Sequence, residues 1–131
     1  MLQKKIENMI PENADILIVK PFWANKLLSG EKTMEIRGQS CMNKLNTTIY
    51  LSKSGTQHVY GSLVFNDCVG PLTKEEFDSF HSMHCVSTDS STTPYKKTYG
   101  WICEAPVIFE RPIPYLHKKG AIVWLKYKSI D

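Results

Sequence analysis

Between Ile16 and Arg37 the hydrophobic pattern of the chain changes its period, and this change limits the folds that the sequence can adopt. The run "ILIVK", Ile16 to Lys20, is short, apolar and β-branched, which predicts a buried strand. "PFWANKLLS" follows, with Pro21 suited to a first helical turn and apolar residues at i, i+4 spacing. A helix that ends at the left-handed cap of Gly30 is therefore expected.

From Thr33 onward the pattern alternates with a period of two, which is typical of a strand. Met34 and Ile36 share one face, and the polar side chains share the other: Thr33, Glu35 and Arg37. We expect this strand to line a groove between the early helix and a curled sheet, with Met34 and Ile36 buried and with Glu35 and Arg37 facing the groove.

The rest of the chain contains further strand and helix signals. Strands are expected over 47–52 and 58–69 (with a bend or bulge at Gly61), as two strands with prolines at their margins within 99–115, and over 121–127. Thr73 and Glu76 form a capping box that predicts a helix over 74–84. Residues 86–94 are polar and turn-prone, and residues 1–10 indicate a short N-terminal helix.

This order of elements does not give the regular strand–helix alternation of a parallel doubly wound sheet. It favours an α+β fold: a small mixed β-barrel with one early helix, one middle helix and the short N-terminal helix. The 131 residues contain no internal repeat or linker, so a single domain over 1–131 is predicted. Barrels of this size commonly bind ligands at a mouth or in a groove against a helix.

Several functional classes are disfavoured by composition. No apolar run approaches the ~20 residues of a membrane helix, and the N-terminus lacks the apolar core of a signal peptide, so a cytoplasmic or nuclear protein is expected. The four cysteines stand singly and are expected to be free thiols. "HSMHC", His81 to Cys85, has no second ligand pair, so we expect neither a metal nor a cofactor.

Charge is distributed unevenly along the chain. Residues 95–131 contain seven Lys or Arg and three Asp or Glu, which gives +4, whereas the whole chain carries +3 and residues 1–94 therefore carry −1. A basic C-terminal third indicates an anionic partner such as nucleic acid. A solvated lysine-rich surface explains the same charges, and charge alone leaves the two interpretations open.

The stretch "ILIVKPFWANKLLSGEKTMEIR" resembles the opening of ASCH domains, a PUA-like fold related to the domain of activating signal cointegrator 1. The family's signature is G-x-K-x-x-E-x-R after a helix, and Gly30, Lys32, Glu35 and Arg37 meet it in full. "KPFWA" before it, and "YGWICEAP" and "PIPYLHKKGAIVWLK" near the end, also resemble family segments. The resemblance covers about residues 16–127.

The resemblance implies a PUA-like barrel that binds nucleic acid, chiefly RNA, in a cleft lined by the signature. Its expected partner is RNA, another single-stranded nucleic acid or a nucleotide. Arg37 braced by Glu35 presents a planar fork to a phosphate or a base edge, and a carboxylate can accept from an exocyclic amine. The candidate binding residues are Lys20, Trp23, Lys32, Glu35, Arg37, Ser52, Lys53, Tyr99, Trp101 and Lys118.

Three alternatives to nucleic-acid recognition stay open. A Glu–Arg pair on a strand is also a common surface salt bridge, worth at most about 1 kcal/mol. Some small bacterial ASCH proteins hydrolyse acetylated cytidine with a lysine and a threonine; Lys32 matches the lysine, but Glu35 holds the threonine's place, so catalysis by Lys32 and Glu35 is the less favoured hypothesis. A protein-interaction adaptor is the third. The sequence does not specify the ligand or the oligomeric state.

Overall fold

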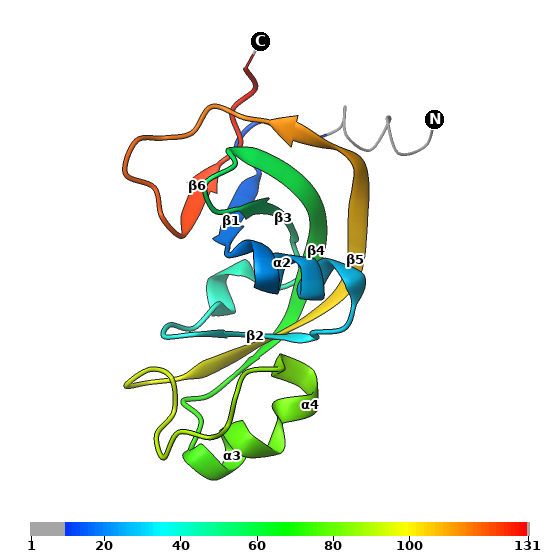
Figure 1. The fold of residues 1–131 in the computed structure, drawn as a ribbon. Helices are drawn as coiled ribbons and strands as arrows, with labels where there is room; N and C mark the ends of the chain where they lie inside the picture. The colour runs from blue at the N-terminus through cyan, green and yellow to red at the C-terminus, as the bar shows by residue number, and fades with distance from the viewer. Residues whose placement is uncertain (1–9, 131) are drawn as a thin grey trace.

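The computed structural model describes residues 10–130, so the short helix predicted over residues 1–10 lies almost entirely outside the described part of the chain. Figure 1 shows the arrangement of the elements. The strands are β1 (Asp15–Val19), β2 (Met34–Arg37), β3 (Thr48–Lys53), β4 (His58–Val69), β5 (Tyr99–Pro114) and β6 (Trp124–Lys126). The helices are α2 (Pro21–Ser29), α3 (Lys74–Ser79) and α4 (His81–His84), with a 3₁₀ turn at Met42–Lys44.

The six strands form one mixed sheet in the order β2-β5-β4-β3-β1-β6. Only the pairing of β1 with β3 is parallel, and the other pairings are antiparallel. The long strands β4 and β5 curve so that the sheet forms a half-barrel, with α2 lying against its concave side (Figure 1). A mixed α+β sheet of this kind confirms the fold class predicted from the order of elements, at the level of a half-barrel.

Two irregularities let the long hairpin of β4 and β5 bend. The register shifts around Gly61, as predicted, and a Cβ at this position would lie 2.1 Å from the carbonyl oxygen of Val107. The prediction of two strands within 99–115 is wrong, because β5 runs without interruption through this segment. Ala105 takes a left-handed conformation (φ 54°), and the register shift beside it accommodates the extra residue as a bulge.

The helix predicted over 74–84 is divided into α3 and α4 at Phe80, whose ψ of 12° departs from helical geometry. The capping box of Thr73 and Glu76 begins α3 as predicted. The break brings the His84 ring onto the Phe77 ring, with centroids 4.2 Å apart. Local spacing gives no sign of this stacking, which explains why the sequence predicted one helix.

The last strand is also shorter than the predicted 121–127. A turn places the Ala121 amide on the carbonyl of Lys118 (3.0 Å), with Gly120 at φ 87°, so the chain joins the sheet only at Trp124. Ile122 is consequently 80% exposed despite its β-branched side chain. No helix among residues 10–130 is long and apolar enough to cross a membrane.

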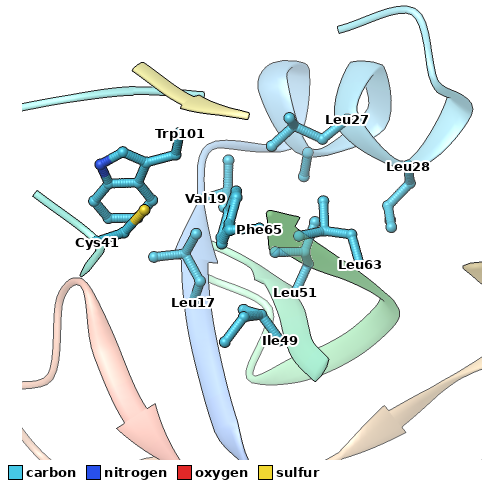
Figure 2. Packing of buried hydrophobic residues seen from close by; sticks show 11 residues of the cluster. Leu17, Val19, Leu27, Leu28, Cys41, Ile49, Leu51, Leu63, Phe65 and Trp101 are labelled. Carbon is cyan, nitrogen blue, oxygen red and sulfur yellow. The ribbon is translucent and has the colours of Figure 1, made fainter. Parts of the chain in front are cut away.

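The main hydrophobic core lies between α2 and the curved sheet (Figure 2). Leu27 and Leu28 of α2 pack on side chains from the neighbouring strands, among them Leu17, Val19, Ile49, Leu51, Leu63, Phe65 and Trp101. The Pro21 start and the left-handed Gly30 cap (φ 84°) fix where α2 begins and ends. This core therefore fixes the end of β1 and the helix on the sheet, whereas Met34 and Ile36 of β2 pack in a second cluster with Leu72 and Phe77.

Candidate functional site

A pocket of about 360 Å³ opens where the end of β1, the start of α2 and the strand β2 meet the loop after α4. We call it the signature pocket, because three of its lining residues belong to the G-x-K-x-x-E-x-R motif: Lys32, Glu35 and Arg37. Its other lining residues are Ile18, Val19, Lys20, Trp23, Ile36, Ser54, Val86, Pro94, Tyr95 and Ile122. Met34 and Ile36 are buried, as the alternation predicted, although Ile36 also lines the pocket and Glu35 is buried as well.

Glu35 is the centre of the charged network in this pocket. Its carboxylate is 5% exposed and lies between two cations. Oε2 accepts from Nε of Arg37 (2.9 Å) and forms an ion pair with its Nη2 (2.8 Å), while Oε1 accepts from the backbone N–H of Ile36 (3.2 Å). Oε1 also lies 3.7 Å from Nζ of Lys32. Buried carboxylates persist where such partners offset their desolvation.

Lys32 is not the accessible point charge that its place after the helix cap suggested. Its side chain is 1% exposed, and Nζ donates to the carbonyl oxygen of His84 at 2.5 Å. The same Nζ lies 4.5 Å from the centre of the Trp23 ring. Burial lowers the pKa of Lys32 below its ordinary value, although the nearby Glu35 acts in the opposite direction. Lys32 therefore supports Glu35 and Trp23 from a buried position in the wall of the pocket.

Arg37 is held on two sides. Nε donates to Glu35, and Nη2 donates to the carbonyl oxygen of Ile18 at 3.2 Å while lying 2.8 Å from the Glu35 carboxylate. Among residues 10–130, Nη1 makes no hydrogen bond, so its two N–H groups stay available to a ligand. Contacts within the protein thus occupy part of the planar guanidinium that the sequence led us to expect. Nη1 is the part that can reach a base or a phosphate.

His84 positions this network and was missed as a site residue. Its Nδ1 accepts from the backbone N–H of Val86 (2.9 Å), so Nε2 carries the proton that it donates to the carbonyl of Phe77 (2.7 Å). Burial lowers the pKa of His84, which favours this neutral form. Both nitrogens are engaged, and no group of His, Cys, Asp and Glu that could hold a metal occurs in the described part of the chain.

The remaining candidates from the sequence are spread over different places. Lys20 and Trp23 line the signature pocket, whereas Ser52 and Lys53 line a neighbouring depression. Ser52 is buried there and shares a hydrogen bond with the Tyr115 hydroxyl (2.8 Å). Lys118 lines a third depression, which shares His117 with that one.

The prediction that Trp101 is a binding residue is wrong. Its side chain is 2% exposed and donates its indole N–H to the Gln39 carbonyl (2.8 Å), so it cannot stack on a base. Tyr99 is half-buried opposite Arg37 in the sheet and does not line the pocket. Besides Trp23, the aromatic residue that lines the pocket is Tyr95, at 45% exposure, which directly follows the segment 86–94 predicted to be turn-prone. The segment "TPYKKTYGW" contains three aromatic residues, and no local feature of the sequence indicates that Tyr95 is the one that lines the pocket.

The four cysteines are free thiols, as expected. Burial raises the pKa of Cys41 to about 12 and that of Cys103 to about 11. A thiol with so high a pKa is a poor nucleophile near neutral pH. Cys41 and Cys103 therefore act as small apolar side chains, and neither of them lines the signature pocket.

The fold is that of ASCH proteins of known structure. The crystal structure of ASCH from Zymomonas mobilis superposes with a TM-score of 0.64 at 18% identity, over 78% of this chain and 73% of that chain. A serine-to-alanine variant of the Zymomonas mobilis protein gives 0.70 at 14% identity over 89% of both chains, and a tyrosine-to-phenylalanine variant gives 0.62 at 17%. This likeness confirms the ASCH fold expected from the signature. No protein-family model and no curated protein sequence matches the chain.

Proposed function

We propose that this protein binds RNA and holds one nucleotide, through its base, in the signature pocket. The observation that carries this proposal is the fixed guanidinium of Arg37, which Glu35 and the Ile18 carbonyl orient while Nη1 stays available. A guanidinium with its orientation set by the protein loses little further entropy when it binds a base edge or a phosphate.

The composition of the pocket fits a nucleotide better than a purely apolar ligand. Lys20, Lys32 and Arg37 exceed the single carboxylate of Glu35 by two charges. Trp23 and Tyr95 also line the pocket, and aromatic rings stack on unpaired bases for about 1–3 kcal/mol per base. A volume of about 360 Å³ lies within the usual range for small-ligand sites. Charge, stacking surface and size together support a single extruded nucleotide.

Arg37→Lys tests the proposal, and Arg111→Lys is its matched control. Arg37 and Arg111 are the two arginines of the chain, and Arg111 is exposed on β5 away from the signature pocket. Arg37→Lys keeps the charge and loses the fork, so it should weaken binding of single-stranded RNA by roughly 1–3 kcal/mol and blur any preference between sequences. Fluorescence anisotropy on two RNAs measures both effects. Equal affinities for wild type and Arg37→Lys on every RNA would refute the proposal.

Hydrolysis of an acylated nucleoside is the second candidate, because a lysine whose pKa is lowered by burial lines the same pocket beside a carboxylate. In that case Lys32→Ala would abolish turnover of acetylated cytidine while the variant stays folded. Chromatography of the nucleoside before and after incubation decides the matter. No product from the wild-type protein, with an active hydrolase as the control, ends this hypothesis and leaves the binding proposal standing.

A further inference from the structure

One depression adjoins the signature pocket, and a second adjoins the first. The first, of about 320 Å³, is the bridge depression, lined among others by Ile18, Lys53, Ser54, His117 and Ile122. The second, of about 570 Å³, is the lysine pocket, defined by Lys44, Lys118, Lys126, Lys128, Asp15 and Trp124. Both lie along β1 and the segment between β5 and β6.

The three depressions are consecutive neighbours. The bridge depression shares Ile18, Ser54 and Ile122 with the signature pocket, and it shares His117 with the lysine pocket. The Nδ1 atom of His117 is buried and has no hydrogen-bond partner among the described residues. An unpaired buried polar atom is uncommon in a folded protein. A phosphate or ribose hydroxyl could supply that partner after rotation of the ring.

Charge is concentrated along this row of depressions. Their linings contain eight of the chain's 16 Lys and Arg but only two of its 13 Asp and Glu. The linings therefore carry +6, while the whole chain carries +3, so the remainder of the chain carries −3. A surface that segregates its charges in this way attracts a polyanion to one side.

Within residues 10–130, the lining of the lysine pocket contains more cations than carboxylates. Asp15 pairs with Lys44 (3.0 Å) and with Lys126 (2.6 Å), and it is the one carboxylate in the lining. Lys128 donates to the side chain of Asn13, a neutral partner. Four lysines against one aspartate leave a charge of +3 in a single pocket. Lysine ammonium groups suit backbone phosphates, because they act as flexible point charges.

We propose that the lysine pocket binds backbone phosphates of the same RNA strand whose nucleotide occupies the signature pocket, with the strand crossing the bridge depression. This inference rests on the proposed function. Asp15 lies in the lysine pocket and Ile18 to Lys20 line the signature pocket, three to five residues further along the chain. At ~3.3 Å per strand residue the separation is roughly 10–17 Å. A stacked strand that advances ~3.4 Å per nucleotide covers it with about three to five nucleotides.

The test measures affinity against RNA length for two matched double variants. Lys118→Gln/Lys128→Gln removes two charges from the lysine pocket, and Lys96→Gln/Lys97→Gln removes two exposed charges that line none of the depressions. The probes are single-stranded RNAs of one to eight nucleotides at several salt concentrations. The affinity of the wild-type protein should rise between two and about five nucleotides. The lysine-pocket variant should lose that rise and keep wild-type affinity for a mononucleotide.

Two lost phosphate contacts should flatten the salt slope on the octamer by about 1.4. If these contacts contribute nothing to RNA affinity at 1 M salt, the variant should bind the octamer roughly 25-fold more weakly than wild type at 0.1 M salt. Equal losses in the two double variants, or no rise of affinity with length, would overturn the inference while mononucleotide binding upheld the proposed function. No mononucleotide binding would instead refute the proposed function. Equal affinity for polyglutamate of similar length would also overturn the inference, since the pocket would then accept any polyanion.

Discussion

Glu35→Gln should destabilise the fold far more than an ordinary surface charge substitution, because Glu35 is the buried centre of the ion network. The carboxylate lies 2.8 Å from Nη2 of Arg37 and 3.7 Å from Nζ of Lys32. With an effective dielectric constant of ~20, these pairs correspond to attractions of about 6 and about 4.5 kcal/mol before desolvation. The glutamine avoids the desolvation cost of Glu35 but leaves the two cations without a buried counter-charge.

Glutamine also has the wrong hydrogen-bonding groups for this position. Glu35 accepts from Arg37 with one oxygen and from the Ile36 N–H with the other, and an amide can supply an acceptor on only one side. Removal of one partner from a buried ion pair costs about 3–5 kcal/mol. We therefore expect a loss of this size in the free energy of unfolding.

Urea unfolding followed by tryptophan fluorescence measures this loss. With a slope of ~2 kcal/mol/M, the midpoint should fall by about 1.5–2.5 M. Glu31→Gln is the matched control, because Glu31 also pairs with a lysine, Lys26, at 2.6 Å, but its side chain is 61% exposed. Its midpoint should shift only slightly. Equal shifts for the two variants would show that the network at Glu35 contributes no more than a surface pair, and the reasoning would fail.

Two further predictions concern Lys32 and the glycines. Burial lowers the pKa of Lys32, so between that lowered value and 10.5 the unfolded chain binds an extra proton and stability should rise with pH, by about 1.4 kcal/mol for each pH unit between the two pKa values. The free energy of unfolding of wild type should therefore rise relative to that of Lys32→Met between pH 7 and 10.5. A constant difference between the two proteins would contradict a lowered pKa of Lys32. Gly61→Ala should cost about 3 kcal/mol or more, since its methyl would lie 2.1 Å from a backbone oxygen of β5. Gly30→Ala has open space and only the strain of φ +84°, so about 1–2 kcal/mol is expected, and the reverse order in urea unfolding would refute this account of the bend in β4.

Features with a local physical cause were predictable from the sequence. Pro21 and Gly30 mark the ends of α2, and the alternation after Thr33 separates the buried Met34 from the pocket-lining Glu35. Thr73 caps α3 through its own hydroxyl, and Gly61 marks the bend in β4. Each of these signals acts over a few residues, so neither the rest of the chain nor a structure is needed to interpret it.

Features that depend on distant partners were not predictable. Lys32 is buried because the carbonyl of His84, 52 residues further along the chain, accepts from it. Tyr95 lines the pocket and Trp101 lies in the core, although both follow the same polar loop. The continuity of β5 depends on its pairing with β4, which overrides the interruption that the prolines of this segment suggested. In each case tertiary contacts outweigh local preference.

A crystal structure of the protein soaked with a ribonucleoside monophosphate shows directly whether the signature pocket holds a base. We predict a base in the signature pocket, beside Trp23 or Tyr95, with Nη1 of Arg37 within about 3.2 Å of an acceptor on the nucleotide. The contacts of Arg37 with Glu35 and with the Ile18 carbonyl should persist in that complex. A nucleotide bound elsewhere, with the signature pocket empty and Nη1 free of ligand contacts, would contradict the claim that this pocket recognises RNA.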